Sequence, residues 1–347
     1  MAIVRETIKF IVFIFLLIGI SSAQKIGVDL SHGQDSSSIT QLRDIVEKLG
    51  FELVEVRDFN VKDLDELQGL IIDPGDEISD EELRVLENWF KKGGKMLWIS
   101  GKYDKEISKI YFANKILERV ESKLRLEQLT LIKYTTYSEP LYVIADVVNN
   151  KSNISSGVSK VLFYSPTIVC GYDYLFGFIP VKTYVSLEDS SVADVEWVIK
   201  SGFGSIAILL NNSSTPFVHE PYICPLRQLP TKAVCVCGRE PWEFEEEAMK
   251  RKSGYVVMAT EFFAGPKLDN KIIVTGSLVY GENSIVTKSY TNPARKINLD
   301  GVELTKNALA WGMKIEKGSK KANFLNYYLL ALISIFTVLV ILKRLRS

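Results

Sequence analysis

Small polar residues and glycines follow four short apolar runs of the sequence, at 25–30, 70–72, 96–99 and 271–275. If these runs are parallel strands of one open sheet, their carboxyl ends meet at one edge, which is where such sheets bind ligands. Turns between strands and helices also require glycine, serine and aspartate, so the pattern is typical of ordinary turns as well. We predict a candidate ligand-binding rim made of Asp29, Ser31, His32, Gly33, Asp73, Ser100, Gly101, Gly276 and Ser277.

The chemistry that this rim offers most directly is hydrolysis by a serine nucleophile. Ser100 would need a positioned base and oxyanion donors, and His32 is the histidine expected on the same rim. The other histidine, His219, falls in an irregular stretch of the sequence. No cysteine stands at a strand-to-helix turn, and no carboxylates have the spacing of metal ligands. We therefore expect no enzyme, and a hydrolase that uses Ser100 and His32 is an alternative.

The segment 69–101 positions much of this rim. A short apolar run that ends at Asp73 is typical of a strand buried on both faces. Ser79 and Glu82 have the spacing of a capping box, and apolar residues then recur at helical intervals up to a pair of glycines. A second buried run ends at Ser100. A strand, a crossover helix and a strand form a βαβ unit, which predicts a parallel sheet.

The same alternation opens the chain. Apolar periodicity predicts a strand at 25–30, a helix at 37–49, a strand at 51–56 and a brief helical turn at 61–67. Together with the segment that follows, this gives a β-α-β-α-β-α-β order over the first hundred residues. The order predicts an α/β fold with a doubly wound, mostly parallel sheet.

The pattern changes to short strands and polar loops beyond a predicted helix at 106–126. The stretch 211–253 is the least regular, and we interpret it as a solvated insertion. A closing helix runs through Leu304 and Trp311. We assign residues 24–314 to one α/β domain with β-rich additions, in which later strands are predicted at 141–148, 158–164, 168–171, 180–185, 205–210, 255–260 and 271–275.

Two hydrophobic runs lie near the ends of the chain. Residues 1–23 have the basic, apolar and small-residue order of a secretory signal, with an uncleaved anchor helix as the alternative. Residues 324–342 carry no charge and are long enough to cross a bilayer. With 315–323 as a linker and 343–347 as a basic cytoplasmic tail, we predict a single-pass type I protein of the cell membrane whose body lies outside the cytoplasm. The membrane bilayer is then a partner.

Composition and sequons are compatible with export. The formal net charge is zero, so no charge excess indicates nucleic acid as a partner. Glycosylation sequons form two polar clusters, and modification would place both clusters on the surface. The acceptor asparagines are Asn150, Asn153, Asn211 and Asn212.

The four cysteines are an even number, which an oxidising compartment would allow to pair. Cys224 is close in sequence to Cys235 and Cys237, so we predict a disulfide to one of these two, and Cys170 is a further candidate. The alternate cysteines at 235 and 237 are also compatible with the start of a thiolate metal site, but the chain offers few other soft ligands. We expect neither a metal nor a cofactor.

Four stretches of the chain resemble the class I glutamine-amidotransferase-like fold. They are an Asp-x-Ser-His-Gly turn at 29–33, the strand–Pro-Gly–helix–Gly-Gly–strand unit at 69–101, the stretch 156–166 and the stretch 272–277. The resemblance covers residues 25–314. Within that superfamily, the chain more specifically resembles the non-catalytic branch. This branch includes auxiliary components of ABC transporters, an intraflagellar transport subunit and a lumenal subunit of oligosaccharyltransferase.

The resemblance implies a fold without the chemistry of its catalytic members. Those members carry a nucleophilic cysteine at a strand-to-helix turn and a histidine further on, whereas this sequence has Ser100-Gly101 at that turn. It therefore implies a non-enzymatic scaffold or binding domain, an accessory subunit of a membrane complex such as an ABC transporter. A counterpart of the oligosaccharyltransferase subunit is an alternative, although that subunit has further β-rich modules for which this chain has no room. A small-molecule or glycan ligand on the rim is compatible with either role.

Overall fold

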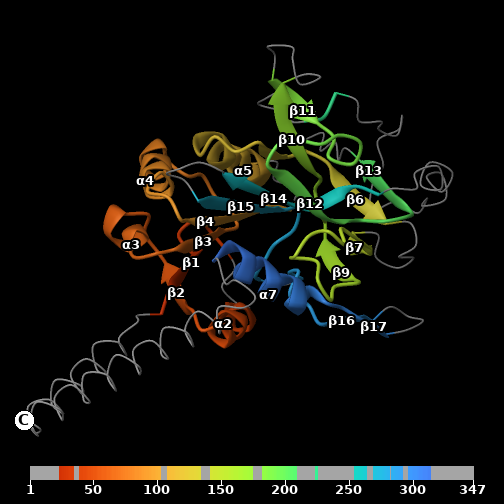
Figure 1. Cartoon of the computed structure of the whole chain (residues 1–347), viewed down its shortest axis with the longest axis horizontal. Coiled ribbons are helices and arrows are strands. Elements are labelled where there is room, and N and C mark those ends of the chain that lie inside the picture. The colour runs from red at the N-terminus through yellow and green to blue at the C-terminus, as the bar shows by residue number, and fades with distance from the viewer. Residues whose placement is uncertain are drawn as a thin grey trace, which may run out of the picture.

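The central element of the fold is one sheet of eight strands, in the order β2-β1-β3-β4-β15-β14-β12-β8 (Figure 1). Smaller sheets of two or three strands lie around it. The structure, a computed structural model, describes residues 23–34, 39–102, 108–133, 141–174, 182–208, 223–225, 254–263, 269–281, 283–291 and 296–313.

Five neighbouring strands of the central sheet are parallel. β1 (Lys25–Asp29) pairs with β2 (Glu52–Val56) and with β3 (Gly69–Ile72), β3 pairs with β4 (Met96–Ser100), and β4 pairs with β15 (Asn270–Thr275). Parallel neighbours cannot be joined by a tight turn, so a helix connects each successive pair of the first four strands. These helices are α2 (Ile39–Lys48), α3 (Val61–Asp65) and α4 (Asp80–Phe90).

The other three strands make the sheet a mixed one. β14 (Val256–Phe263) is antiparallel to β15, β12 (Val195–Lys200) to β14, and β8 (Val147–Val148) to β12. Only the residues between 263 and 270 connect β14 to β15, too few for the crossover that a parallel pair needs. Strands hold 36% and helices 23% of the described residues. The predicted doubly wound, mostly parallel sheet is therefore wrong, because three strands of the central sheet pair antiparallel in this β-rich fold, and so do all strands of the smaller sheets among the described residues.

The smaller sheets are antiparallel, and all of their strands follow α5 (Ser108–Arg119) in the chain. Five of the nine strands described in these sheets overlap predicted ones. β5 falls within the predicted helix at 106–126, and no prediction covers β6, β16 or β17, nor β12 of the central sheet. The sheets are β5 (Leu124–Leu126) with β10 (Val169–Tyr174) and β11 (Lys182–Val185), β6 (Thr130–Lys133) with β13 (Ser205–Ile208), β7 (Tyr142–Ala145) with β9 (Val161–Tyr164), and β16 (Ser289–Thr291) with β17 (Lys296–Asn298).

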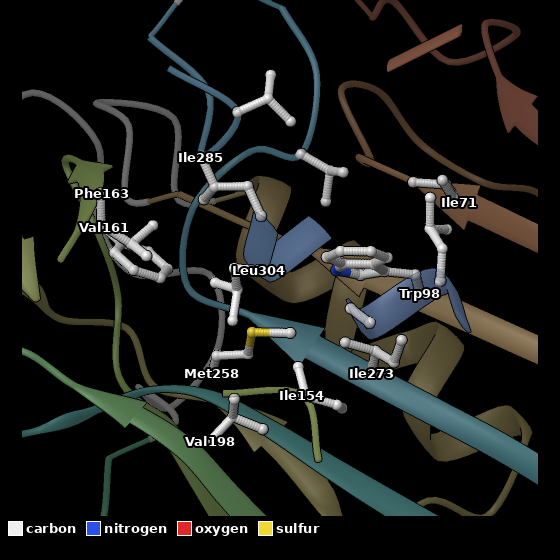
Figure 2. Close-up of a cluster of buried hydrophobic side chains, with 14 of the residues drawn as sticks. Ile71, Trp98, Ile154, Val161, Phe163, Val198, Met258, Ile273, Ile285 and Leu304 are labelled. Atoms are coloured by element: carbon white, nitrogen blue, oxygen red, sulfur yellow. The ribbon is translucent and has the colours of Figure 1, made fainter. Parts of the chain in front are cut away.

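Helices cover both faces of the central sheet (Figure 1). Successive side chains of a strand point to opposite faces, so Ile71 and Trp98 join a buried cluster with α2 and with α7 (Gly301–Gly312) (Figure 2). Their neighbour Ile72 joins a second cluster on the other face, with α3, α4 and α5 (Ser108–Arg119). Two continuous apolar cores therefore hold the parallel strands rigidly from both sides, and this fixes the positions of their carboxyl ends.

Two helix ends illustrate what the sequence does and does not determine. The capping box at the start of α4 is confirmed: the Glu82 N–H donates to Ser79 Oγ at 3.3 Å, and the Ser79 N–H donates to Glu82 Oε2 at 2.9 Å. The predicted helix at 106–126 is too long, since α5 ends at Arg119. The chain turns there because Glu121 adopts a left-handed φ of 58°, which a sequence without a glycine at that point does not indicate.

The membrane predictions require correction. None of the helices in the described part of the chain has both the length and the apolar composition that a membrane crossing requires. The predicted linker, transmembrane helix and tail (315–347), and all but the last residue of the predicted signal peptide, lie outside the described residues. The structure thus supports neither a C-terminal transmembrane helix nor a single-pass membrane localisation, and neither belongs to the function proposed for the chain.

Candidate functional site

The carboxyl ends of the parallel strands meet at one edge of the sheet. Ile72 of β3 lies opposite Ile99 of β4, and Ser100 of β4 lies opposite Thr275 of β15. β1 lies on the other side of β3 and ends at Asp29. Side chains that directly follow these strands are therefore brought to a common edge, from positions up to 250 residues apart in the chain.

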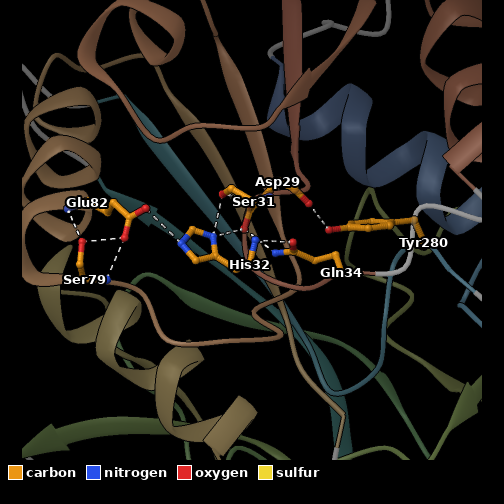
Figure 3. A network of polar contacts seen from close by, with 7 residues as sticks. All are labelled: Asp29, Ser31, His32, Gln34, Ser79, Glu82 and Tyr280. Carbon is orange, nitrogen blue, oxygen red and sulfur yellow. Dashed lines mark hydrogen bonds and ion pairs between the residues drawn. The ribbon is translucent and has the colours of Figure 1, made fainter.

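Asp29 is the centre of a buried hydrogen-bond network at this edge (Figure 3). One carboxylate oxygen accepts from the Ser31 N–H at 2.9 Å and from the Ser31 hydroxyl at 2.6 Å. The other accepts from Gln34 Nε2 at 2.5 Å and lies 2.9 Å from His32 Nδ1. The Asp29 carbonyl oxygen accepts from the Tyr280 hydroxyl at 2.7 Å. These donors compensate the burial of a carboxylate that is 0% exposed.

His32 lies between two carboxylates. Its Nδ1 faces Asp29, and its Nε2 lies 3.4 Å from Glu82 Oε1 on α4. The ring packs edge-on against Phe59, with 5.0 Å between centroids. Burial lowers the pKa of His32, but the hydrogen bond and charge of Asp29, followed by those of Glu82, raise this pKa above its ordinary value. The two carboxylates therefore stabilise the imidazolium form, in which both ring nitrogens are donors.

The loops that follow β1 and β3 pack closely and are joined by a backbone hydrogen bond. The Asp76 N–H donates to the His32 carbonyl oxygen at 2.9 Å. A Cβ at Gly75 would lie 2.3 Å from that same oxygen, so only glycine allows the loops to come this close. Gly33 has a φ of 68°, which favours glycine. Part of the rim sequence is thus required by the turns themselves.

A cavity of about 330 Å³ opens beside the Asp29 network. This volume is at the lower end of those that hold small-molecule ligands. Both loops, α5 and the segment after β15 contribute to its walls. Its polar side chains are Gln34, Asp73, Lys102, Lys109, Tyr164 and Asn283.

Asp73 has the least satisfied environment in this cavity. It is 5% exposed, and neither carboxyl oxygen accepts a hydrogen bond of normal geometry from the described residues. Burial raises the pKa of Asp73 well above its usual range, while the N–H groups of Val279 and Tyr280 and the charge of Lys102 lower it only in part. Buried polar groups are nearly always hydrogen-bonded, so an unsatisfied carboxyl in a cavity wall indicates a place for an external donor.

The other residues of the predicted rim do not line the cavity. Three of them make hydrogen bonds within the fold, and the hydroxyl of the fourth makes none among the described residues. Gly101 and Gly276 donate backbone hydrogen bonds to β15 and β14. Ser277 Oγ donates to the Tyr164 carbonyl oxygen at 3.1 Å and accepts from the Tyr164 N–H at 3.2 Å. Ser100 is buried, and its hydroxyl has no hydrogen-bond partner among the described residues. Of the nine predicted residues, Gly33 and Asp73 line the cavity, and Asp29, Ser31 and His32 form the adjoining network.

This arrangement does not assemble the hydrolytic pair considered from the sequence. No hydrogen bond joins Ser100 to His32, and the two ring nitrogens of His32 face Asp29 and Glu82. A histidine held in this way cannot accept the proton of a serine nucleophile. Within the described ranges, no three His, Cys, Asp or Glu side chains are grouped to bind a metal ion.

Several residues of the site escaped the sequence analysis. The capping-box spacing predicts only that Glu82 caps α4. In the structure, one carboxylate oxygen of Glu82 caps the helix and the other faces His32. Gln34 and Lys102 each directly follow the last residue of a predicted rim turn, so extending the turns by one residue would have included them. Tyr280 and Asn283 belong to an irregular segment after β15 and have no recognisable local signal.

The predicted modification sites are only partly described. Asn150 and Asn153 are exposed, and their glycosylation remains a prediction. Cys170 is buried, and its thiol donates to the Arg125 carbonyl oxygen at 3.6 Å. Cys224 is also buried. The disulfide remains a prediction, because the residues outside the described part include Asn211, Asn212, Cys235 and Cys237.

Comparisons with known proteins identify a fold but no family. No family model matches the sequence, and no curated protein is similar to it. Among solved structures, the chain is similar to one described as "mmIFT52 N-terminal domain", with a TM-score of 0.51 and 12% identity. The match covers 85% of this chain and 99% of that one. At this identity the likeness indicates a shared fold, and it extends over nearly the whole of the other domain.

Proposed function

We propose that this chain is a non-enzymatic subunit of a protein complex, built on the non-catalytic form of the glutamine-amidotransferase-like fold. The observation that carries the proposal is the fold likeness to the IFT52 N-terminal domain, which covers 99% of that domain. The geometry of the rim supports it, because His32 is held between Asp29 and Glu82 and makes no contact with Ser100. A fold that lacks the nucleophile of its catalytic members is available for a role in assembly.

The identity of the complex is the finer part of this proposal. The sequence resemblance implies an ABC transporter as the first candidate and an oligosaccharyltransferase-type assembly as the second. Both would use the domain built on the central sheet as a binding module. The two candidates differ in the partner that they require, a transport ATPase and permease or a glycosyltransferase.

The proposal is tested by isolating the full chain from its native cells under mild conditions. We expect it to elute in a stable complex, with one or more other polypeptides at fixed stoichiometry in quantitative mass spectrometry. A tagged chain that elutes alone at its own mass of 39.2 kDa would contradict the subunit role.

The non-enzymatic part is tested separately by a screen for ester, amide and glycoside hydrolysis. The wild-type chain is compared with His32→Ala and Ser100→Ala, and we expect no turnover above that of a mock preparation. Turnover that disappears in both variants would show that the Ser100–His32 hydrolase is correct. Turnover that persists in both would indicate a contaminant and leave the non-enzymatic assignment in place.

A further inference from the structure

Beyond a role in assembly, we propose that the fold binds one internal water molecule, held between the carboxyl of Asp73 and the hydroxyl of Ser100. This site lies at the carboxyl ends of β3 and β4, and it is independent of the subunit role. Three features of the described residues support it: the register of the two strands, the position of the unsatisfied polar atoms, and the hydrogen-bonding chemistry of the two side chains.

The strand register makes Asp73 and Ser100 neighbours. Ile72 of β3 lies opposite Ile99 of β4 in the parallel pair. Asp73 is the next residue after the first of these, and Ser100 is the next residue after the second. Neighbouring strands lie only about 4.7–4.9 Å apart, so the two side chains start from adjacent positions at the edge of the sheet.

Both side chains also point to the same face of the sheet. Side chains two residues apart in a strand share a face. Asp73 lies two residues after Ile71, and Ser100 lies two residues after Trp98. Ile71 and Trp98 belong to one buried cluster, and so does the segment 279–280, whose N–H groups approach the Asp73 carboxyl. The carboxyl and the hydroxyl are therefore neighbours on the face covered by α2 and α7.

Most of the unsatisfied polar atoms of the described structure lie at this one place. Five buried side-chain nitrogen or oxygen atoms lack a hydrogen-bond partner among the described residues, and three of them are Asp73 Oδ1, Asp73 Oδ2 and Ser100 Oγ. Asp73 is 5% exposed and Ser100 0%, so bulk solvent does not compensate them. Buried polar groups are nearly always hydrogen-bonded. Two adjacent unsatisfied groups therefore indicate one partner that both of them share.

A water molecule has the chemistry that this partner needs. It accepts the Ser100 O–H and donates to a carboxyl oxygen of Asp73, and buried waters typically make two to four such bonds. The neighbouring chain is a poorer source of donors, because Pro74 has no N–H and Gly75 has no side chain. Asp73 also lines the cavity of about 330 Å³, which gives water a route to the site.

A metal cation fits the same place less well. It would require the charged carboxylate, and burial disfavours that form by raising the pKa of Asp73 well above its usual range. Within the described ranges, no three His, Cys, Asp or Glu side chains are grouped to bind a metal ion. Water donates to a carboxylate and accepts from a carboxylic acid, so it satisfies Asp73 in either form.

The first experiment is a crystal structure of the full chain at a resolution that shows ordered water. We expect a density peak at hydrogen-bond distance, about 2.6–3.2 Å, from both a carboxyl oxygen of Asp73 and Ser100 Oγ. Ser100→Ala removes one of the two partners, so the peak should disappear. Ser205→Ala is the matched control, because Ser205 is also buried but its hydroxyl donates to the Ser201 carbonyl oxygen at 3.2 Å. This control should leave the peak unchanged.

The second experiment counts long-lived internal waters in solution by oxygen-17 magnetic relaxation dispersion. Wild type and Ser205→Ala should give the same count, and Ser100→Ala should give one fewer. The proposal is overturned if Asp73 and Ser100 bond directly with no peak between them, or if another side chain fills the position. It is also overturned if the peak shows the metal–oxygen distances of a bound cation, about 2.0–2.6 Å, or if Ser100→Ala retains the wild-type count.

Discussion

Asp29 and Asp73 lie at the carboxyl ends of neighbouring strands but have opposite environments. Each follows the buried core of a parallel strand, and those strands, β1 and β3, are neighbours in the sheet. Both carboxyls are buried. The carboxylate of Asp29 has donors on both oxygens, whereas that of Asp73 has no well-formed hydrogen bond among the described residues.

The difference comes from the residues that follow each aspartate. Ser31, His32 and Gln34 supply the donors of Asp29 from within five positions of the chain. Asp73 is followed by Pro74, which has no N–H, and by Gly75, which has no side chain. An aspartate at a strand end is thus part of a self-contained hydrogen-bond network in one loop and an unsatisfied group in the next. Three measurements test this difference between the two carboxyls.

The largest effect is expected from Asp29→Ala. This change removes the acceptor of Ser31, Gln34 and His32 and leaves a buried imidazolium without its nearest carboxylate. We expect the free energy of unfolding at pH 7 to fall by about 3–5 kcal/mol, the range for breaking a buried ion pair. Urea denaturation checks this, with Asp44→Ala on the exposed face of α2 as the control. A loss below about 1 kcal/mol would mean that the network does not hold the loop.

Asp73→Asn keeps the shape of the side chain, and we expect it to raise the free energy of unfolding, opposite to the effect of Asp29→Ala. It removes a carboxyl whose ionisation is disfavoured by burial, so we expect a gain of about 1–3 kcal/mol at pH 7 without ligand. The folded-state pKa of Asp73 is raised, so its contribution to stability is fully present below the unfolded value of 3.8 and is lost as pH rises. The gain should therefore shrink toward zero near pH 4. A destabilised variant at pH 7 would show that the described structure misses a partner of Asp73.

The smallest change in stability is expected from His32→Gln, and its size should depend on pH. The pKa of this residue is raised in the folded state, so its stabilising contribution is fully present below 6.5 and is lost as pH rises through the folded-state value. We expect wild type to exceed His32→Gln by about 1.5 kcal/mol near pH 5.5, and the difference to fall at higher pH. Chemical denaturation at several pH values measures it.

Glu82→Gln is the matched control for this measurement. Glutamine preserves the capping box with Ser79 but removes the negative charge near His32 Nε2. We expect the loss of stability to be about 0.5 kcal/mol near pH 5.5 and to disappear at high pH. A pH-independent loss of the same size would assign Glu82 to helix capping alone.

The first hundred residues were predictable because their elements are local. The capping box of Ser79 and Glu82 and the apolar runs that end at Asp73 and Ser100 each depend on neighbours in sequence. The strand-end turn at Asp29 is equally local, since its donors follow within five residues. Such features require no knowledge of the distant chain, and the rim could therefore be anticipated where it consists of turns.

The mixed sheet and the cavity depend on contacts that no local pattern contains. β12 reads Val-Glu-Trp-Val-Ile-Lys, without a clean alternation of apolar and polar residues, and yet it pairs in the interior of the sheet. The wrong fold prediction came from extending the parallel winding of the first hundred residues to the whole sheet, whereas the sheet becomes antiparallel from β15 to β14 onward. Tyr280 reaches Asp29 from 251 positions away, so the network and the adjoining cavity wall could not be derived from spacing.

The position of β15 has a consequence for synthesis of the protein. β15 pairs with β4, and the Lys95 N–H donates to the side chain of Asn270, 175 positions later. A ribosome adds 5–20 residues per second, so the edge of β4 waits roughly 10–35 s for its partner. All five residues of β4 are buried in the finished protein. During that interval the nascent chain presents an unpaired apolar strand edge, and this is where a chaperone, or another nascent copy, would first engage it.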